Sequence, residues 1–181
     1  MDKILASYVE DFATTHGFCS VPPGDQFHHF VNYCVVSRAT SDSFDIEDVS
    51  TEGEGDTGVD GVAVLVSGHI VSSPEDVDYF RDRVGRLDVE FIFIQSKSGK
   101  HFSAADIGTF LFGVKEFFSE APQAPANTAI SAFRDLKDYI YFDCVLVLIG
   151  SKLFCKTPFR WMEPTERRKP WNGGLQCVTR N

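Results

Sequence analysis

The sequence lacks the signatures of membrane proteins, secreted proteins and disulfide-stabilised proteins. No apolar run approaches the roughly 20 residues that span a membrane. The N-terminus carries the charged residues Asp2, Lys3 and Glu10, which argues against a signal peptide. The five cysteines are odd in number and have no C-x-x-C spacing, which favours isolated thiols in a reducing compartment. We therefore expect a cytoplasmic protein without a membrane partner.

The sequence also lacks a phosphate-binding loop and a nucleophile elbow. S-G-K-H-F-S at residues 98–103 is not a phosphate-binding loop, because His101 stands where Ser or Thr belongs and Ile94 stands where the first Gly belongs. Ser67 lacks the flanking residues of a nucleophile elbow. The chain has no internal repeat and no low-complexity tract. A nucleotide-hydrolysing switch is therefore the least favoured function class.

Basic residues are scarce in most of the chain, whose net charge is −9. Residues 151–181 hold seven Lys or Arg and two Glu, so the first 150 residues hold 10 basic against 24 acidic side chains. Residues 40–60 contain eight acidic residues and no basic one, which predicts a solvated acidic loop. This balance argues against general nucleic-acid binding, which depends on basic contacts to phosphate, although a bound dication would reverse the local sign.

The residues that are present suffice for one folded domain. At 181 residues, with 43% hydrophobic residues and 17 Phe, the chain can bury a core of ordinary size. We expect residues 1–150 to form this domain and residues 151–181 to form a basic C-terminal tail that is incomplete or irregular. A missing C-terminal domain or partner chain would complete the fold beyond the last buried strand.

Hydrophobic periodicity and capping residues predict alternating helices and strands. The predicted helices span residues 2–16, 25–38, 74–84, 103–118 and 128–136. The predicted strands span residues 44–49, 59–66, 70–71, 89–97 and 139–149. The central part of this order is αβββαβ, which indicates an α/β fold with a mixed sheet flanked by helices. His28 and His29 diverge on their helix, and we expect both to be ordinary, partly exposed histidines.

Residues 89–97 read V-E-F-I-F-I-Q-S-K, a buried strand that ends on polar side chains. Side chains two apart on a strand point the same way, so Gln95 and Lys97 share one face. If strands 59–66 and 89–97 pair antiparallel, the start of the first meets the end of the second. This pairing would bring Asp60 beside Gln95 and Lys97 and concentrate polar groups at one edge of the sheet.

These strand-end motifs resemble those of a nuclease superfamily. G-V-D-G, followed by a hydrophobic strand ending in Q-S-K, resembles PD-(D/E)XK nucleases of the variant in which Gln replaces Glu, as in Mrr-like restriction endonucleases. The strings D-T-G-V-D-G and F-I-Q-S-K, with a Phe-Ser-capped helix ending K-E-F-F, resemble the N-terminal part of abortive-infection phage-resistance (AIPR) proteins. The resemblance covers residues 25–150, and residues after Lys156 depart from it. It implies a restriction-endonuclease-like αβββαβ core.

The resemblance also implies the roles of four residues. Asp60 is the metal-binding aspartate, the Gln95 side chain and the Ser96 carbonyl supply further oxygen ligands, and Lys97 orients the attacking water and steadies charge on the transition state. Such hard oxygen ligands suit Mg²⁺ or Mn²⁺.

Gln in place of Glu removes one negative ligand, so we expect a further carboxylate. Asp56, Glu47 and Glu10 are candidates, and of these we prefer Glu47.

The expected function is divalent-metal-dependent phosphodiester hydrolysis of nucleic acid, with DNA preferred to RNA. By resemblance alone, this activity would serve anti-phage abortive-infection defence. The alternative is a truncated or degenerate nuclease fold that acts as a non-catalytic binding module. The acidic surface and the missing Glu favour this alternative.

Overall fold

The chain folds into a mixed α/β structure. The computed structural model describes residues 2–51, 53–84, 87–99, 103–144 and 154–156. The helices of this part are α1 (Lys3–His16), α2 (Pro23–Val36), α3 (Pro74–Val84), α4 (Ala104–Phe117) and α5 (Thr128–Asp138). The strands are β1 (Gly61–Val66), β2 (His69–Val71), β3 (Asp88–Ile94) and β4 (Phe154–Lys156). No helix in these ranges is both long and apolar enough to cross a membrane.

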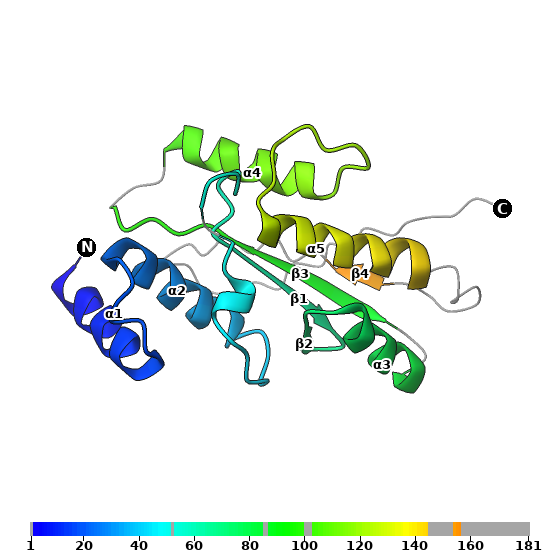
Figure 1. The fold of residues 1–181 in the computed structure, drawn as a ribbon, viewed down its shortest axis with the longest axis horizontal. Coiled ribbons are helices and arrows are strands. Elements are labelled where there is room, and N and C mark those ends of the chain that lie inside the picture. Colours follow the sequence, from blue (N-terminus) through cyan, green and yellow to red (C-terminus); the bar gives the residue numbers. More distant parts are fainter. Residues whose placement is uncertain (1, 52, 85–86, 100–102, 145–153, 157–181) are drawn as a thin grey trace, which may run out of the picture.

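The described strands form one mixed sheet in the order β2-β1-β3-β4 (Figure 1). β1 pairs antiparallel with both β2 and β3, whereas β4 runs parallel to β3. Gly61 at the start of β1 lies opposite Ile94 at the end of β3. The two strands thus meet the condition of antiparallel pairing that brings Asp60 to the end of β3. β4 lies beyond residue 150, where the sequence predicts the domain to end.

Helices cover both faces of the central strand pair. Val62 and Val64 of β1 belong to a buried cluster that includes Phe117 of α4 and Leu136 of α5. The alternate residue Ala63 belongs to a second cluster with Val36 of α2. Every residue of β1 is buried, as expected for a strand packed on both faces. The polar ends of β1 and β3 therefore lie between helices.

The N-terminus of α4 is fixed by a capping box. The Ser103 hydroxyl accepts a hydrogen bond from the Asp106 backbone N–H, and the Asp106 carboxylate accepts one in return from the Ser103 backbone N–H. This S-x-x-D pattern satisfies two backbone donors that a helix start would otherwise leave unpaired. The predicted start of this helix is confirmed.

The predicted strand at residues 44–49 is wrong. Residues Glu47–Val49 form a 3₁₀-helix, η1, whose backbone bonds include Val49 N–H to Ile46 O at 3.3 Å. Ile46 and Val49 are both buried, and their spacing of three fits a 3₁₀ turn better than the alternation of a strand. The predicted short strand at residues 70–71 is present as β2. It pairs antiparallel with β1 and so takes the place in the sheet that residues 44–49 were expected to fill.

The predicted strand at residues 139–149 is wrong over its described part. Residues Tyr139–Asp143 form one π-helical turn, η2, that follows directly on α5. Leu136, Ile140 and Cys144 are buried at the spacing of four that a helix requires. A short apolar run alone does not separate a buried strand from a buried helix. Residues 145–149 lie outside the described residues.

Candidate functional site

Asp60 precedes β1 and is held in place by its own backbone. Its N–H donates to the Ile94 carbonyl at 2.8 Å, which continues the β1–β3 ladder by one residue. Its carbonyl accepts hydrogen bonds from the Asn32 side-chain amide at 3.0 Å and from the Thr51 N–H at 3.2 Å. The residue is 8% exposed. Asp60 is therefore a rigid, buried acid at the end of β3.

The two oxygens of the Asp60 carboxylate have different surroundings. Oδ2 accepts hydrogen bonds from the Ser96 N–H at 2.6 Å and the Ser96 hydroxyl at 3.3 Å. Oδ1 lies 3.8 Å from Nδ1 of His28 on α2. Burial raises the pKa of Asp60, with a smaller contribution from nearby Asp56, while Ser96 and His28 act in the opposite direction. The folded protein therefore disfavours the charge that this carboxylate would carry at neutral pH.

Two glycines of the G-V-D-G motif let the chain pass close to neighbouring side chains. Gly58 has φ +76°, and a Cβ there would lie 3.2 Å from the Gln95 amide nitrogen. A Cβ on Gly61 would lie only 2.5 Å from the Asn32 amide oxygen. Only glycine fits both positions without displacing these neighbours. The motif thus packs Asp60 against α2 and brings the turn before it against Gln95.

Gln95 and Lys97 both contact Asp106 of α4, in accord with the predicted shared face. Lys97 Nζ lies 2.9 Å from Asp106 Oδ1, and the Gln95 amide donates to the Asp106 carbonyl at 3.4 Å. The other carboxylate oxygen of Asp106 accepts from Ser103. Hydrogen bonds from Lys97 first, and then from Ser103, lower the pKa of Asp106 to about 2. The capping box therefore fixes a carboxylate whose free oxygen binds the lysine.

The predicted site residues thus divide between two sides of the strand end. Asp60 contacts Ser96 and faces His28, whereas Gln95 and Lys97 turn toward α4. In the described part of the chain, no hydrogen bond or ion pair joins Asp60 to Gln95 or Lys97.

Glu47, the preferred additional carboxylate, lies in η1 with its side chain exposed. It lines a hollow with residues of the α1–α2 connection, such as Phe18. Among the described residues, no hydrogen bond or ion pair links it to Asp60. Asp56 affects Asp60 more directly, since its charge raises the pKa of Asp60. Asp56 oxygens also accept from the N–H groups of Gly58 and Gly53, which shapes the turn before Asp60.

The donor atoms around Asp60 fit a cation only if amide and carbonyl oxygens take part. No three His, Cys, Asp or Glu side chains within the described ranges gather closely enough to hold a metal ion. Yet the buried Nδ1 of His28 has no hydrogen-bond partner in that part of the structure. A buried nitrogen without a hydrogen-bond partner and a nearby carboxylate oxygen are two atoms that could both bind one cation. The motif resemblance adds the Gln95 side chain and the Ser96 carbonyl as further oxygen ligands, whereas in the structure the Gln95 amide is hydrogen-bonded to Asp106 of α4.

Sequence reasoning missed two residues of this site. His28 and Asn32 are four apart on α2, so the helix face that holds the Asp60 carbonyl also presents His28 to the carboxylate. The sequence shows that His28 and Asn32 share one helix face, but it does not show that this face packs against Asp60. Asp106 was visible only as a capping residue. Neighbouring His29, expected to be partly exposed, is instead buried and lies 3.1 Å from the Ser50 hydroxyl.

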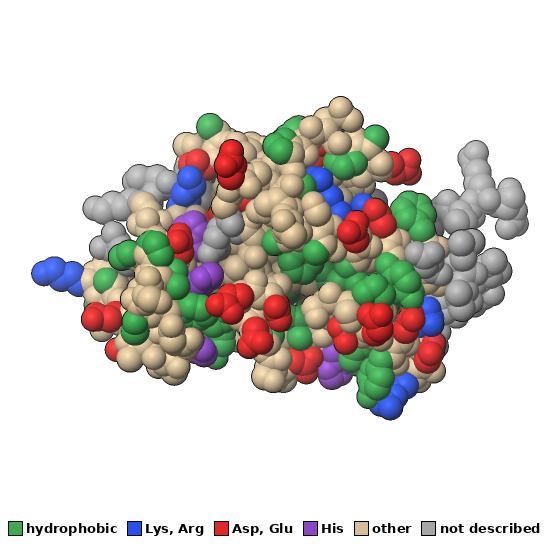
Figure 2. Space-filling model, in the orientation of Figure 1, with side chains coloured by type: hydrophobic (Ala, Val, Ile, Leu, Met, Phe, Trp, Pro, Cys, Tyr) green, Lys and Arg blue, Asp and Glu red, His purple; other side chains and the backbone are tan. Residues whose placement is uncertain are grey.

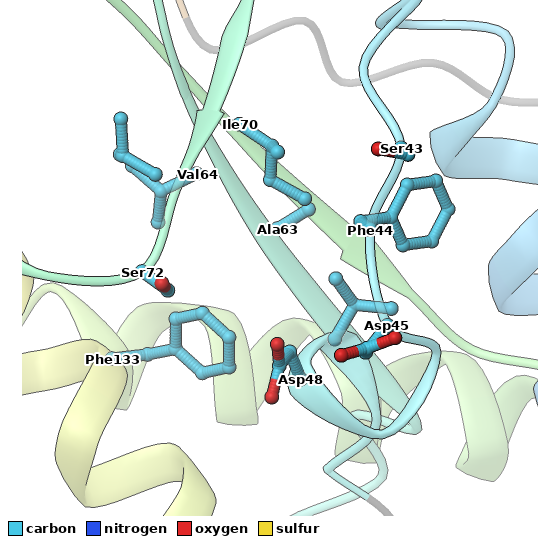
Figure 3. Close-up of a pocket in the computed structure, with 11 residues that line it drawn as sticks. Ser43, Phe44, Asp45, Asp48, Ala63, Val64, Ile70, Ser72 and Phe133 are labelled. Carbon is cyan, nitrogen blue, oxygen red and sulfur yellow. The ribbon is translucent and has the colours of Figure 1, made fainter. Parts of the chain in front are cut away.

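A separate hollow of about 220 Å³ lies between the acidic segment, the sheet and α5. Figure 3 shows the Asp45 and Asp48 carboxylates on one side and the Phe133 ring across from them, with Ile70 and Phe44 above. Its acidic wall would repel a phosphate group. None of Asp60, Gln95 and Lys97 lines this hollow.

The comparison with family models, curated proteins and solved structures found no match to this chain. The resemblance to PD-(D/E)XK nucleases and AIPR proteins therefore stays a prediction.

Proposed function

We propose that this protein is a divalent-metal-dependent nuclease that hydrolyses phosphodiester bonds in nucleic acid, with DNA preferred to RNA. The supporting observation is the β1–β3 register, which sets the buried Asp60 carboxylate against Ser96, between Gln95 and Lys97 in sequence. A restriction-endonuclease-like core and a role in abortive-infection defence belong to this proposal through the motif resemblance alone.

Asp60, Gln95 and the Ser96 carbonyl are the groups that would hold Mg²⁺ or Mn²⁺. When bound, the ion would lower the pKa of a coordinated water and neutralise charge on the phosphate. The Ser96 N–H fixes Oδ2 of Asp60, so Oδ1 is the oxygen available for a cation. Burial also supports this role, because a buried carboxylate with a raised pKa gains most from a nearby positive charge.

Lys97 would act on the substrate rather than on the ion. Its side chain is 41% exposed, so the ammonium can reach a phosphate in solvent. Asp106 holds that ammonium through one carboxylate oxygen while the capping box holds the other. In this proposal, α4 positions the lysine that steadies the transition state.

The direct test compares two lysine variants. The purified chain is incubated with Mg²⁺ or Mn²⁺ and with plasmid DNA, single-stranded DNA or RNA. Lys97→Ala is expected to lower cleavage at least about a hundredfold, the usual range for a group that acts in the transition state. Lys115→Ala, which removes another exposed lysine at the last turn of α4, is the matched control and should cleave like wild type. Equal cleavage by both variants would contradict the proposal.

The second candidate function is a non-catalytic binding module. Figure 2 shows acidic side chains gathered over η1 and along α3, a surface that suits a basic protein partner better than nucleic acid. The ion pair between Lys97 and Asp106 also favours this function, because the carboxylate neutralises the lysine charge that would otherwise attract a phosphate. Titration with Mn²⁺ separates the two functions, because the binding module predicts equal affinity in wild type and Asp60→Asn.

A further inference from the structure

His28 faces the candidate metal site from α2. Its Nδ1 lies 3.8 Å from Asp60 Oδ1 and is buried without a hydrogen-bond partner among the described residues. That separation is too long for an N–H···O hydrogen bond. The buried His28 nitrogen therefore faces the Asp60 carboxylate oxygen without a hydrogen bond to it.

The helix that carries His28 is fixed against Asp60. One turn further along α2, the Asn32 amide donates to the Asp60 carbonyl and to the Ser50 hydroxyl. Asn32 is completely buried, so this contact sets the rotation of α2. His28 consequently lies on the face of α2 that meets the Asp60 carboxylate.

The separation of the two atoms is close to that of neighbouring ligands on one ion. Metal bonds of about 2.1 Å place adjacent ligand atoms roughly 3.0 to 3.4 Å apart. The observed 3.8 Å needs only a small side-chain adjustment to reach that spacing. A cation would satisfy both the orphaned nitrogen and the buried carboxylate.

We propose that His28 Nδ1 is a ligand of the metal ion that Asp60 holds, and that it makes the site prefer Mn²⁺ to Mg²⁺. This inference rests on the proposed metal-dependent function. Imidazole nitrogen is a poor ligand for hard Mg²⁺, which favours oxygen, whereas first-row transition ions accept both donor types.

The test measures metal binding directly. Mn²⁺ and Mg²⁺ are titrated by calorimetry into wild type and His28→Gln, and pulsed electron paramagnetic resonance of the Mn²⁺ complex reports directly bound nitrogen. Wild type is expected to show imidazole nitrogen coupling and tighter binding of Mn²⁺ than of Mg²⁺. His28→Gln should lose the coupling and weaken Mn²⁺ binding about tenfold or more, with a smaller effect on Mg²⁺.

His69→Gln is the matched control. His69 is an exposed histidine on β2 whose Nδ1 lies 3.2 Å from the Asp42 carboxylate, so it is also a histidine beside an acid. It should leave Mn²⁺ affinity and nitrogen coupling unchanged. The Gln side chain in His28→Gln could itself bind the metal ion through its amide oxygen. His28→Ala has no such group and should show the same loss of nitrogen coupling.

Two results would overturn the inference, and they differ in what they say about the function. Asp60-dependent Mn²⁺ binding without nitrogen coupling, equal in wild type and His28→Gln, would exclude His28 as a ligand and leave the nuclease proposal standing. Absence of Asp60-dependent binding of either ion to folded wild-type protein would remove both. Circular dichroism of each variant establishes that it is folded.

Discussion

The two sides of the β3 end differ in how their charges are balanced. On the α2 side, Asp60 is 8% exposed, and burial raises the pKa of its carboxyl group. On the α4 side, Lys97 is 41% exposed at its side chain and is paired with Asp106, whose pKa is lowered. Among the described residues, the acid on the buried side has only His28 within ion-pair distance, whereas the lysine on the exposed side is paired with a carboxylate.

This difference follows from the alternation of an extended chain. Successive side chains point to opposite sides, so Ser96 reaches Asp60 while Gln95 and Lys97 reach Asp106. A metal ion bound by Asp60 would add positive charge beside the buried carboxylate, whereas Lys97 is already paired with Asp106. We therefore expect substitutions on the two sides to separate metal binding from the later use of the lysine.

The largest effect is expected from Asp60→Asn. The new amide oxygen can still accept the Ser96 N–H, so the strand end should keep its geometry. Loss of the negative charge should lower metal-dependent cleavage at least about a hundredfold. Because the folded state raises the pKa of this acid, its neutral replacement should not lower the melting temperature at pH 7. Asp11→Asn, at an exposed position on α1, is the control. Unchanged cleavage in Asp60→Asn would show that the buried side is structural.

Gly61→Ala should disturb the buried side through packing. The added Cβ would meet the Asn32 amide at 2.5 to 2.9 Å, and Asn32 is completely buried. Overpacking of this kind costs about 1 to 3 kcal/mol. Urea unfolding should register this loss. Gly108→Ala is the control, because a Cβ at that position on α4 meets nothing within 4 Å. Equal stability of both variants would show that Asn32 can move aside.

Asp106→Asn should affect the exposed side alone. One oxygen of the amide can still accept from Ser103, whereas the amide nitrogen cannot accept from the Lys97 ammonium. Cleavage should fall about tenfold, the effect expected when a positioning partner is lost, while Mn²⁺ affinity stays unchanged.

Ser103→Ala separates the cap from the lysine contact. It removes the hydroxyl of the capping box and should cost about 1 kcal/mol of stability. Since Asp106 keeps Lys97, cleavage should remain near wild type. A loss of cleavage in Ser103→Ala as large as in Asp106→Asn would mean that α4 acts only through its stability.

The sequence predicted the features of this site that depend on local patterns. Alternation located the strands that form β1 and β3, and S-x-x-D located the start of α4. The predicted strand at residues 139–149 was wrong over its described part because an apolar run fits a strand and a buried helix equally well. The predicted strand at residues 44–49 was wrong because the buried Ile46 and Val49 are three residues apart, which fits a 3₁₀ turn. The contacts of His28 and Asp106 could not be predicted, since they depend on how α2 and α4 pack against the sheet. A capping motif specifies one carboxylate oxygen and leaves open what the other one meets.

The smallest expected effect is the change with pH in the stability difference between wild type and Asp106→Asn. The folded state lowers the pKa of Asp106 from 3.8 to about 2, so its contribution to stability is present above pH 4 and is lost as the pH falls toward 2. Asp106→Asn lacks this contribution at every pH. Urea midpoints should therefore differ between wild type and Asp106→Asn at pH 5 and converge near pH 2, whereas other acids titrate alike in both. Lys97→Ala removes the main cause of the lowered pKa and should shrink the same difference. A gap that stays constant from pH 5 to pH 2 would mean that Asp106 does not hold the lysine in solution, and that the two sides of the strand end are less distinct than their contacts indicate.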